Sequence, residues 1–265
     1  MYWSPWRTAL SQAWQEALDA LWPRRCRLCG AAAEDDLACG RHRLPSAPAG
    51  PRCARCAAPV ASFLPDGSVC PACRHRPPPW ERATVLGDYR SQPVLREWIL
   101  PLKHGGRRDL AEVLGRALAH RIPEARLPAP DSTPGEQRTL LVPVPLHPWR
   151  RLERGHDQAR LLALALSLAS GIPFQALLRR TRDTPPQGEP WAPPRARNVR
   201  DAFTLAHGPW KALGNALSPP PLAGRTVLLV DDVITSGTTA AACTKCLLRA
   251  GAERVELLAL ARAGA

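Results

Sequence analysis

Two neighbouring carboxylates precede a run of small hydroxyl residues late in the chain. Asp231 and Asp232 follow an apolar, branched run at residues 227–230, and residues 235–239 then surround a glycine before a helical pattern begins. Backbone N–H groups at such a strand-to-helix turn can approach a phosphate, and a helix N-terminus favours its negative charge. Carboxylates repel a phosphate but accept hydrogen bonds from the sugar hydroxyls beside it. The stretch therefore predicts a site for a ribose 5-phosphate.

The same stretch resembles the motif for 5-phosphoribosyl-1-pyrophosphate (PRPP) in type I phosphoribosyltransferases, a branched apolar strand followed by Asp-Asp and Thr-Ser/Thr-Gly-x-Thr. The alternative is an ordinary strand-to-helix turn with acidic residues and a hydroxyl N-cap. The resemblance implies that the acids hold the ribose hydroxyls and that the loop binds the 5-phosphate. The residues assigned to PRPP in this way are Asp231, Asp232, Val233, Thr235, Ser236, Gly237, Thr238 and Thr239.

Cysteines are concentrated near the start of the chain, where seven of the nine lie before residue 74, mostly in C-x-x-C pairs. Without the basic-then-apolar layout of a secretory signal, this spacing is typical of metal sites, with free or redox-active thiols as the alternative. Two ligands from each of two tight turns predict tetrahedral zinc sites that are closed and structural. His42 is included because it replaces a fourth cysteine. The predicted ligands are Cys26, Cys29, Cys39 and His42 for one zinc, and Cys53, Cys56, Cys70 and Cys73 for the other.

The composition favours an acidic partner. The 265 residues allow about two domains, and a net charge of +13, carried mostly by arginine, suits phosphorylated metabolites or nucleic acid. A GC-rich genome would raise the arginine content equally. No apolar run reaches the roughly 18 residues of a membrane span, so we expect a cytoplasmic protein without a transmembrane segment.

Strand patterns alternate with helical patterns after the cysteines, which predicts an α/β fold with a mainly parallel sheet. Strands are expected at residues 82–89, 140–145, 202–205, 227–230 and 255–260, and a helix after residue 93 is expected to be interrupted by Pro101. Ligands in such sheets bind beyond the carboxyl ends of the strands, where residues 231–239 lie. The predicted parts are an N-terminal helix (1–22), a double zinc ribbon (23–76), a proline-rich linker (76–80) and a transferase-like domain (80–265) with proline-rich loops at 122–138, 179–200 and 207–223.

The chain as a whole resembles the ComF/GntX family, in which a double zinc ribbon precedes a type I phosphoribosyltransferase domain. Four segments carry the resemblance: the paired cysteines, YRSQPVLREWILPLKHGG, VPVPLHPWRRLERGHDQAR, and TPPQ…RARNVRDAF leading to VLLVDDVITSGTT. The family usually has cysteine at position 42 and Phe-Asn at His156 and Asp157. The resemblance implies a role in natural transformation, PRPP bound with Mg²⁺, single-stranded DNA as a partner, and association with uptake machinery at the inner membrane.

A pyrophosphate needs cations besides the phosphate loop. The turn after the strand at residues 140–145 and the segment behind it offer His147, Arg150, Arg151 and Arg154, although a solvated helix face is the alternative for each arginine. Lys103 is a further candidate, or a lysine placed by the helix dipole. Residues Arg195, Arg197 and Asn198 belong to a loop that either closes over the site or has no catalytic duty. Cys243 and Cys246 are interpreted as small core residues.

Three functions fit these features. The first is a ComF-type PRPP-binding protein of DNA uptake. The second is a phosphoribosyltransferase of nucleotide salvage, which transfers the pentosyl group from PRPP to a nucleobase or amine by displacement at the anomeric carbon. The third is a zinc-ribbon protein that binds nucleic acid and carries a non-catalytic sensor domain. The sequence shows no clear general base and no recognisable nucleobase pocket, so no catalytic residue is assigned.

Overall fold

The computed structural model describes residues 14, 24–33, 37–123, 126–127, 137–181, 202–206 and 222–264. The chain divides into two compact units, Met1–Leu44 and Pro45–Ala265. The predicted N-terminal helix lies outside the described residues except for Trp14, which is helical. Within the described part of the chain, no helix combines the length and the apolar character needed to cross a bilayer.

The first unit holds one tight cysteine ribbon. A bridge between Arg25 and Ala32 closes the first turn, and the 3₁₀ helix η1 (Gly40–His42) carries the last ligand candidate. Leu37 adopts a positive φ of 78°, which an ordinary side chain rarely occupies, and its carbonyl accepts the Arg27 N–H. The backbone is therefore bent sharply between the two halves of the ribbon.

The second unit contains a four-stranded sheet in which every neighbouring pair is parallel. Its order is β1 (Ala83–Asp88), β6 (Arg254–Arg262), β5 (Thr226–Ile234) and β2 (Thr139–Pro143). The strand residues are almost continuously buried, as expected for a sheet covered on both faces. The predicted α/β fold with a mainly parallel sheet is thereby confirmed.

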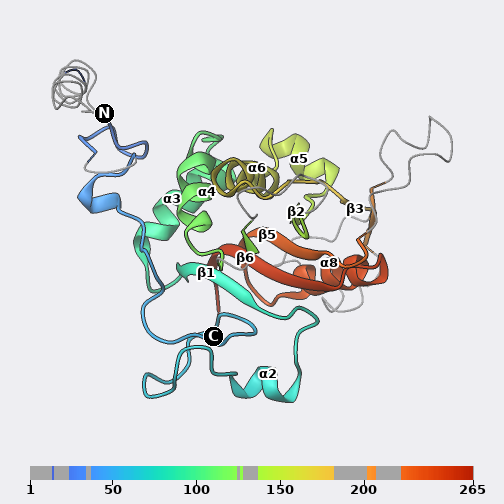
Figure 1. The fold of residues 1–265 in the computed structure, drawn as a ribbon. Helices are drawn as coiled ribbons and strands as arrows, with labels where there is room; N and C mark the ends of the chain where they lie inside the picture. Colours follow the sequence, from blue (N-terminus) through green and yellow to red (C-terminus); the bar gives the residue numbers. More distant parts are fainter. Residues whose placement is uncertain are drawn as a thin grey trace, which may run out of the picture. The chain divides into compact units, whose positions relative to one another are not determined.

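Helices cover both faces of this sheet (Figure 1). One face carries α3 (Pro93–His104), α4 (Leu110–Ala119) and α6 (Gln158–Ser170), whose apolar stripes pack on the strands. The opposite face carries α8 (Thr238–Arg249). Because side chains alternate along a strand, Val227 and Leu229 pack into the cluster with α8, and Leu228 and Val230 belong to the other side.

Three elements differ from the sequence expectations. Helix α3 continues through Pro101, because its buried stripe of Leu95, Trp98, Ile99 and Leu102 holds it against its neighbours; the expected interruption is wrong. Strand β5 runs to Ile234 and so includes both acids. Leu178–Arg180 form a short strand, β3, where an exposed loop from residue 179 was expected.

Strand β3 pairs antiparallel with β4 (Phe203–Leu205), and this hairpin packs beside α8. The buried side chains of Leu178 and Phe203 hold it in the core. The second cysteine ribbon belongs to the same unit and includes the short helix α2 (Pro71–His75). Trp80, in the expected linker, is only 4% exposed and joins the core cluster.

Candidate functional site

The predicted phosphate loop lies at the carboxyl end of β5. Thr235 and Ser236 are exposed, and Gly237 adopts φ 75° as the N-cap of the twelve-residue helix α8. The Ser236 and Thr238 hydroxyls are 2.9 Å apart, and the Thr238 N–H points at the Ser236 oxygen, 3.4 Å away. Hydroxyl groups and the first N–H groups of a long helix are thus gathered at one exposed turn, a suitable arrangement for a phosphate.

The two acids behind this loop face opposite sides of the sheet. Asp232 is 6% exposed, and its Oδ2 lies 3.2 Å from Lys103 Nζ and 3.3 Å from Gln158 Nε2. Asp231 faces α8, because its charge, after desolvation, contributes to raising the pKa of the buried Cys243 thiol. Each carboxylate also accepts the N–H of the next residue, at 2.9 Å for Asp231 and 2.8 Å for Asp232.

The two carboxyl groups differ electrostatically. Desolvation raises the pKa of Asp231 well above its usual value, and repulsion from the Asp232 carboxylate raises it further. The N–H of Asp232 and the charge of Lys103 lower it by less. Of the predicted cations, Lys103 is therefore the one that directly neutralises the acid pair.

The turn after β2 brings a second group of predicted residues beside β5. Strand β2 is the neighbour of β5, and its exit turn leads through His147 to α5 (Pro148–Arg154), a helix in which no residue is buried. His147 Nδ1 accepts the Trp149 N–H at 3.4 Å. Desolvation, followed by the charges of Arg154 and Lys103, lowers the pKa of His104, so Arg154 belongs to the same electrostatic neighbourhood as Lys103.

A set of polar contacts fixes this turn, and the sequence argument did not assign it. Arg108 Nη2 donates to the carbonyl of Gly155, which adopts φ 68°. The His156 ring contacts the Leu102 carbonyl in α3, and Asp157 caps α6 by accepting the Arg160 N–H at 3.1 Å. His156 and Asp157 are the positions that depart from the family pattern, and here they position the turn. The signal in the sequence is the Gly-His-Asp run at the start of a helical pattern.

Gln158 is a site residue that the sequence reasoning retained without a role. It is 6% exposed at the first position of α6, and its amide nitrogen donates to Asp232. Its Oε1 is buried and has no hydrogen-bond partner among the described residues. A buried acceptor beside the acid pair suits a donor from a ligand, such as a sugar hydroxyl.

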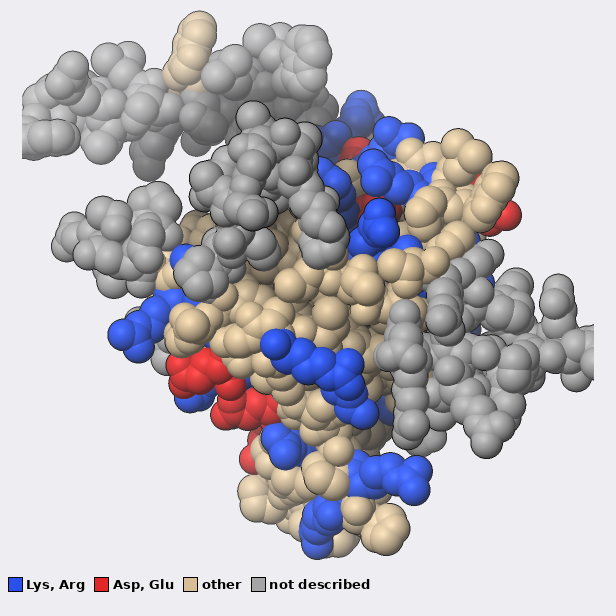
Figure 2. Space-filling model, turned by 90° about the vertical axis from the view of Figure 1, so that its right-hand side faces the viewer, with Lys and Arg blue, Asp and Glu red and all other residues tan. Residues whose placement is uncertain are grey.

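Arg151 lies in a different environment. It lines a cavity of about 490 Å³ between α5, α6 and β3, together with Arg160, Arg179 and Arg180. The cavity floor is apolar, with Pro143, Pro145, Leu146 and Leu178. On the face shown in Figure 2, basic side chains outnumber acidic ones. The candidates Arg195, Arg197 and Asn198 lie outside the described residues.

Both predicted metal sets are assembled. In the first, His42 Nδ1 lies 3.5 Å from Cys26 Sγ and 3.4 Å from Cys39 Sγ, and Cys29 and Cys39 sulfurs are 3.8 Å apart. In each set of four residues the ligand atoms lie within 4.8 Å of one another, which fits a tetrahedral ion with ligand bonds of about 2.0–2.3 Å. The second set consists of Cys53, Cys56, Cys70 and Cys73.

Backbone N–H groups prepare one thiol in each set for metal binding. Desolvation opposes ionisation of Cys26, but hydrogen bonds from the backbone of Cys39, Cys29 and Leu28 outweigh it and lower the pKa to about 6. Cys53 follows the same pattern and has a pKa of about 7. Since thiolates bind zinc, the donor chemistry fits structural zinc in both ribbons.

The two cysteines on α8 do not form part of a metal set. Cys243 is fully buried, and desolvation raises the pKa of its thiol well above the usual value. Cys246 is partly buried, and desolvation raises its pKa as well. Both side chains pack in or against the core cluster.

Comparison with known proteins agrees with both parts of this description. Residues 17–81 match the family described as "Double zinc ribbon domain", and residues 159–265 match "Phosphoribosyl transferase domain". The chain is 34% identical to "DNA utilization protein YhgH" of Escherichia coli K12, over 79% of this chain and 83% of that protein. It is 29% identical to "Competence protein F" of Haemophilus influenzae, over 80% of this chain and 85% of that one.

A solved structure of glutamine PRPP amidotransferase from B. subtilis, complexed with ADP and GMP, is also similar to this chain. The sequence identity is 21%, and the TM-score is 0.36. The similarity covers 61% of this chain and 30% of that chain.

Proposed function

Because the chain belongs to the ComF/GntX family, we propose that it binds PRPP at the β5–α8 turn and acts as a ComF-type protein in DNA uptake. The relatives carry the names of DNA utilization and competence proteins. The observation that carries the ligand proposal is the acid pair at the carboxyl end of β5, directly before the exposed hydroxyl loop. In this proposal the protein handles single-stranded DNA at the cytoplasmic side of the membrane, through uptake partners.

Each element of the site has one task in this proposal. The loop at residues 235–239 receives the 5-phosphate, while Asp231 and Asp232 accept bonds from the ribose hydroxyls. Gln158 Oε1, buried and without a partner among the described residues, offers one more acceptor for a hydroxyl. Lys103 and Arg154 provide positive charge toward the pyrophosphate.

Mg²⁺ would enter with the substrate. When bound, the ion neutralises pyrophosphate charge. The carboxylates of Asp231 and Asp232 are oxygen donors of the kind that the ion prefers. Lys103 limits how far Asp232 can serve a metal, because its ammonium already lies 3.2 Å from Oδ2.

Calorimetric titration with PRPP and Mg²⁺ tests the ligand. We expect the wild type to bind and Asp231→Ala plus Asp232→Ala to lose at least tenfold in affinity, about 1.4 kcal/mol. Glu112→Ala is the matched control, because this exposed acid pairs only with Arg116 on its own helix. Absence of wild-type binding, or equal binding by the double variant, contradicts the proposal.

The arginine-lined cavity favours a second function, direct binding of single-stranded nucleic acid. Phosphates would meet Arg151, Arg160 and Arg179, while the apolar floor accepts sugar or base surface. Affinity should fall steeply with salt, because bound cations are released from the strand. Anisotropy with a labelled oligonucleotide measures this, and Arg151→Ala plus Arg179→Ala should reduce the salt slope by about two-thirds of a unit or more per lost contact. No binding at low salt rejects it.

The salvage reaction remains a competing outcome for the same PRPP site. Pyrophosphate release from PRPP in the presence of a panel of nucleobases and amines tests it directly. Release with one acceptor assigns pentosyl transfer, and binding without release assigns PRPP as a signal or positioning ligand.

A further inference from the structure

The phosphate loop rests on a tryptophan from the far end of the second ribbon. A Cβ built on Gly237 would lie 2.8 Å from Cη2 of Trp80, so the indole ring fills the space directly beneath the loop. Trp80 is 4% exposed and belongs to the same core cluster as Ala240 at the start of α8. The loop can therefore occupy its observed position only while this ring stays in place and residue 237 lacks a side chain.

The second metal set holds this ring. Trp80 Nε1 donates to the carbonyl of Arg55, the residue between Cys53 and Cys56. The Arg55 guanidinium returns two bonds, to the carbonyls of Trp80 at 3.3 Å and Glu81 at 3.0 Å. The cysteine turn and the tryptophan are thus connected in both directions.

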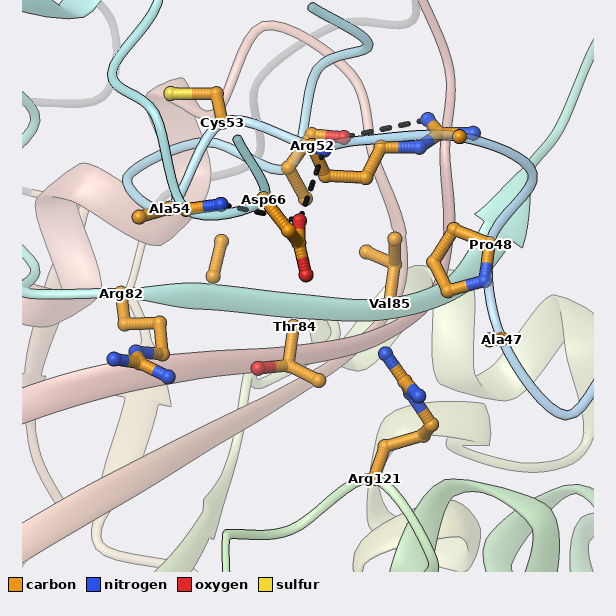
Figure 3. A pocket seen from close by; sticks show the side chains of 14 residues that line it. Ala47, Pro48, Arg52, Cys53, Ala54, Asp66, Arg82, Thr84, Val85 and Arg121 are labelled. Atoms are coloured by element: carbon orange, nitrogen blue, oxygen red, sulfur yellow. Dashed lines mark hydrogen bonds between the residues drawn. The ribbon is translucent and has the colours of Figure 1, made fainter. Parts of the chain in front are cut away.

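The same turn is attached to the edge of the sheet. Ala83, the first residue of β1, donates its N–H to the Ala54 carbonyl at 3.0 Å. Figure 3 shows Arg52 and Cys53 on one side of a cavity, with Val85 of β1 on the other. Arg52 is 9% exposed and lies 3.8 Å from Asp88 at the end of β1. The turn is therefore bonded to the body that carries the phosphate loop.

We propose that the second cysteine set is a positioning element for the phosphate loop, acting through Arg55 and Trp80. Zinc fixes the backbone of residues 53–56, and the Arg55 carbonyl then fixes the indole under Gly237. Without the metal, this short ribbon loses the bonds that order it, because it has little apolar core of its own. The indole then loses its acceptor, and the loop loses its support. Trp80 is a positioning residue, since it touches the loop from below.

This inference rests on the proposed function only where affinity for PRPP is measured, so the first readout is independent of any ligand. Hydrogen exchange of the backbone amides at residues 234–242 reports the order of the loop. We expect faster exchange there in Cys53→Ser plus Cys56→Ser, in Trp80→Ala and, to a smaller extent, in Trp80→Phe, which keeps a ring but loses the N–H donor.

The matched control is Cys26→Ser plus Cys29→Ser, which removes the other zinc. Metal analysis should show the loss of one zinc ion in each double variant, and exchange at residues 234–242 should change only when the second set is removed. Trp80→Phe keeps the test valid if the cysteine variant fails to fold. Unchanged exchange in both tryptophan variants overturns the inference.

The second readout is PRPP affinity, expected to fall about tenfold in Trp80→Ala, equivalent to about 1.4 kcal/mol, and less in Trp80→Phe. The control Cys26→Ser plus Cys29→Ser should bind as the wild type does. If the wild type binds no PRPP, the proposed function fails, while the exchange data still decide the role of Trp80. Normal affinity together with normal exchange in Trp80→Ala contradicts the coupling.

Discussion

At the scale of single residues, the protonation of Asp231 is a testable property of the site. Its pKa is raised well above the usual value, chiefly by desolvation. Between the ordinary pKa of aspartate, about 3.9, and the raised folded value, the folded state binds more protons than the unfolded state, so stability falls as the pH rises. We expect Asp231→Asn to be more stable than the wild type at neutral pH, with the gain vanishing near pH 4 and below.

Chemical unfolding at several pH values measures this gain. Asp232→Asn is the matched control, because it removes the acid that Lys103 and Gln158 contact. That variant should not be stabilised. A wild-type and Asp231→Asn difference that does not depend on pH would show that the raised pKa is not the cause.

His42 gives a second prediction at this scale. Its Nδ1 lies within 3.5 Å of two thiol sulfurs, so the imidazole occupies the fourth corner of the first set. Metal analysis of the purified protein should give two zinc ions per chain for the wild type and for His42→Cys, because thiolate and imidazole are interchangeable ligands. His42→Ala should hold one zinc ion firmly, and two firmly held ions in that variant would exclude the histidine as a ligand.

At the scale of elements, the packing of α4 on α6 depends on one glycine. A Cβ on Gly115 would lie 2.6 Å from the Cβ of Ala165 and 3.0 Å from the Leu166 nitrogen. Replacing glycine by alanine inside a helix normally stabilises it by about 1 kcal/mol. Here we expect Gly115→Ala to reduce the free energy of unfolding by about 1–3 kcal/mol, because the helices must separate.

Urea denaturation tests the sign of this change. Gly115→Ala plus Ala165→Gly restores space at the contact, so the double variant should recover part of the loss. Equal additivity of the two single changes would show that the two positions do not clash.

Periodicity and spacing predicted these elements well where local pattern decides them. Strands near residues 82–89, 140–145 and 255–260 follow from apolar, branched runs. The passage of α3 through Pro101 could not be predicted, because tertiary burial of Trp98 and Leu102 outweighs the local cost of proline. The role of Trp80 was also hidden, since a proline-rich stretch reads as a linker until its last residue is seen under Gly237.

The site divides in the same way. The acid pair, the hydroxyl loop and the metal ligands form short motifs, so the sequence alone proposes them. The contacts of Lys103, Gln158 and His156 connect segments far apart in the chain, and no local pattern specifies such pairs.

At the scale of the whole molecule, the second unit should fold without the first. Residues 45–265 contain the complete four-stranded sheet and the second metal set. We expect a chain of these residues to unfold cooperatively, to hold one zinc ion, and to show the same exchange at residues 234–242 as the full chain. Calorimetry and metal analysis check this, and an aggregated or metal-free product would contradict it.

The position of β6 has a consequence for synthesis on the ribosome. This strand comes late in the sequence, yet it lies inside the sheet, where Leu257 pairs with Ala83 and Val230 pairs with Leu258. Until residue 262 leaves the exit tunnel, β1 and the β5–β2 pair present open, apolar edges with no partner between them. The nascent chain must therefore be shielded from aggregation for almost its entire translation, and a premature stop before residue 254 would leave nothing able to fold.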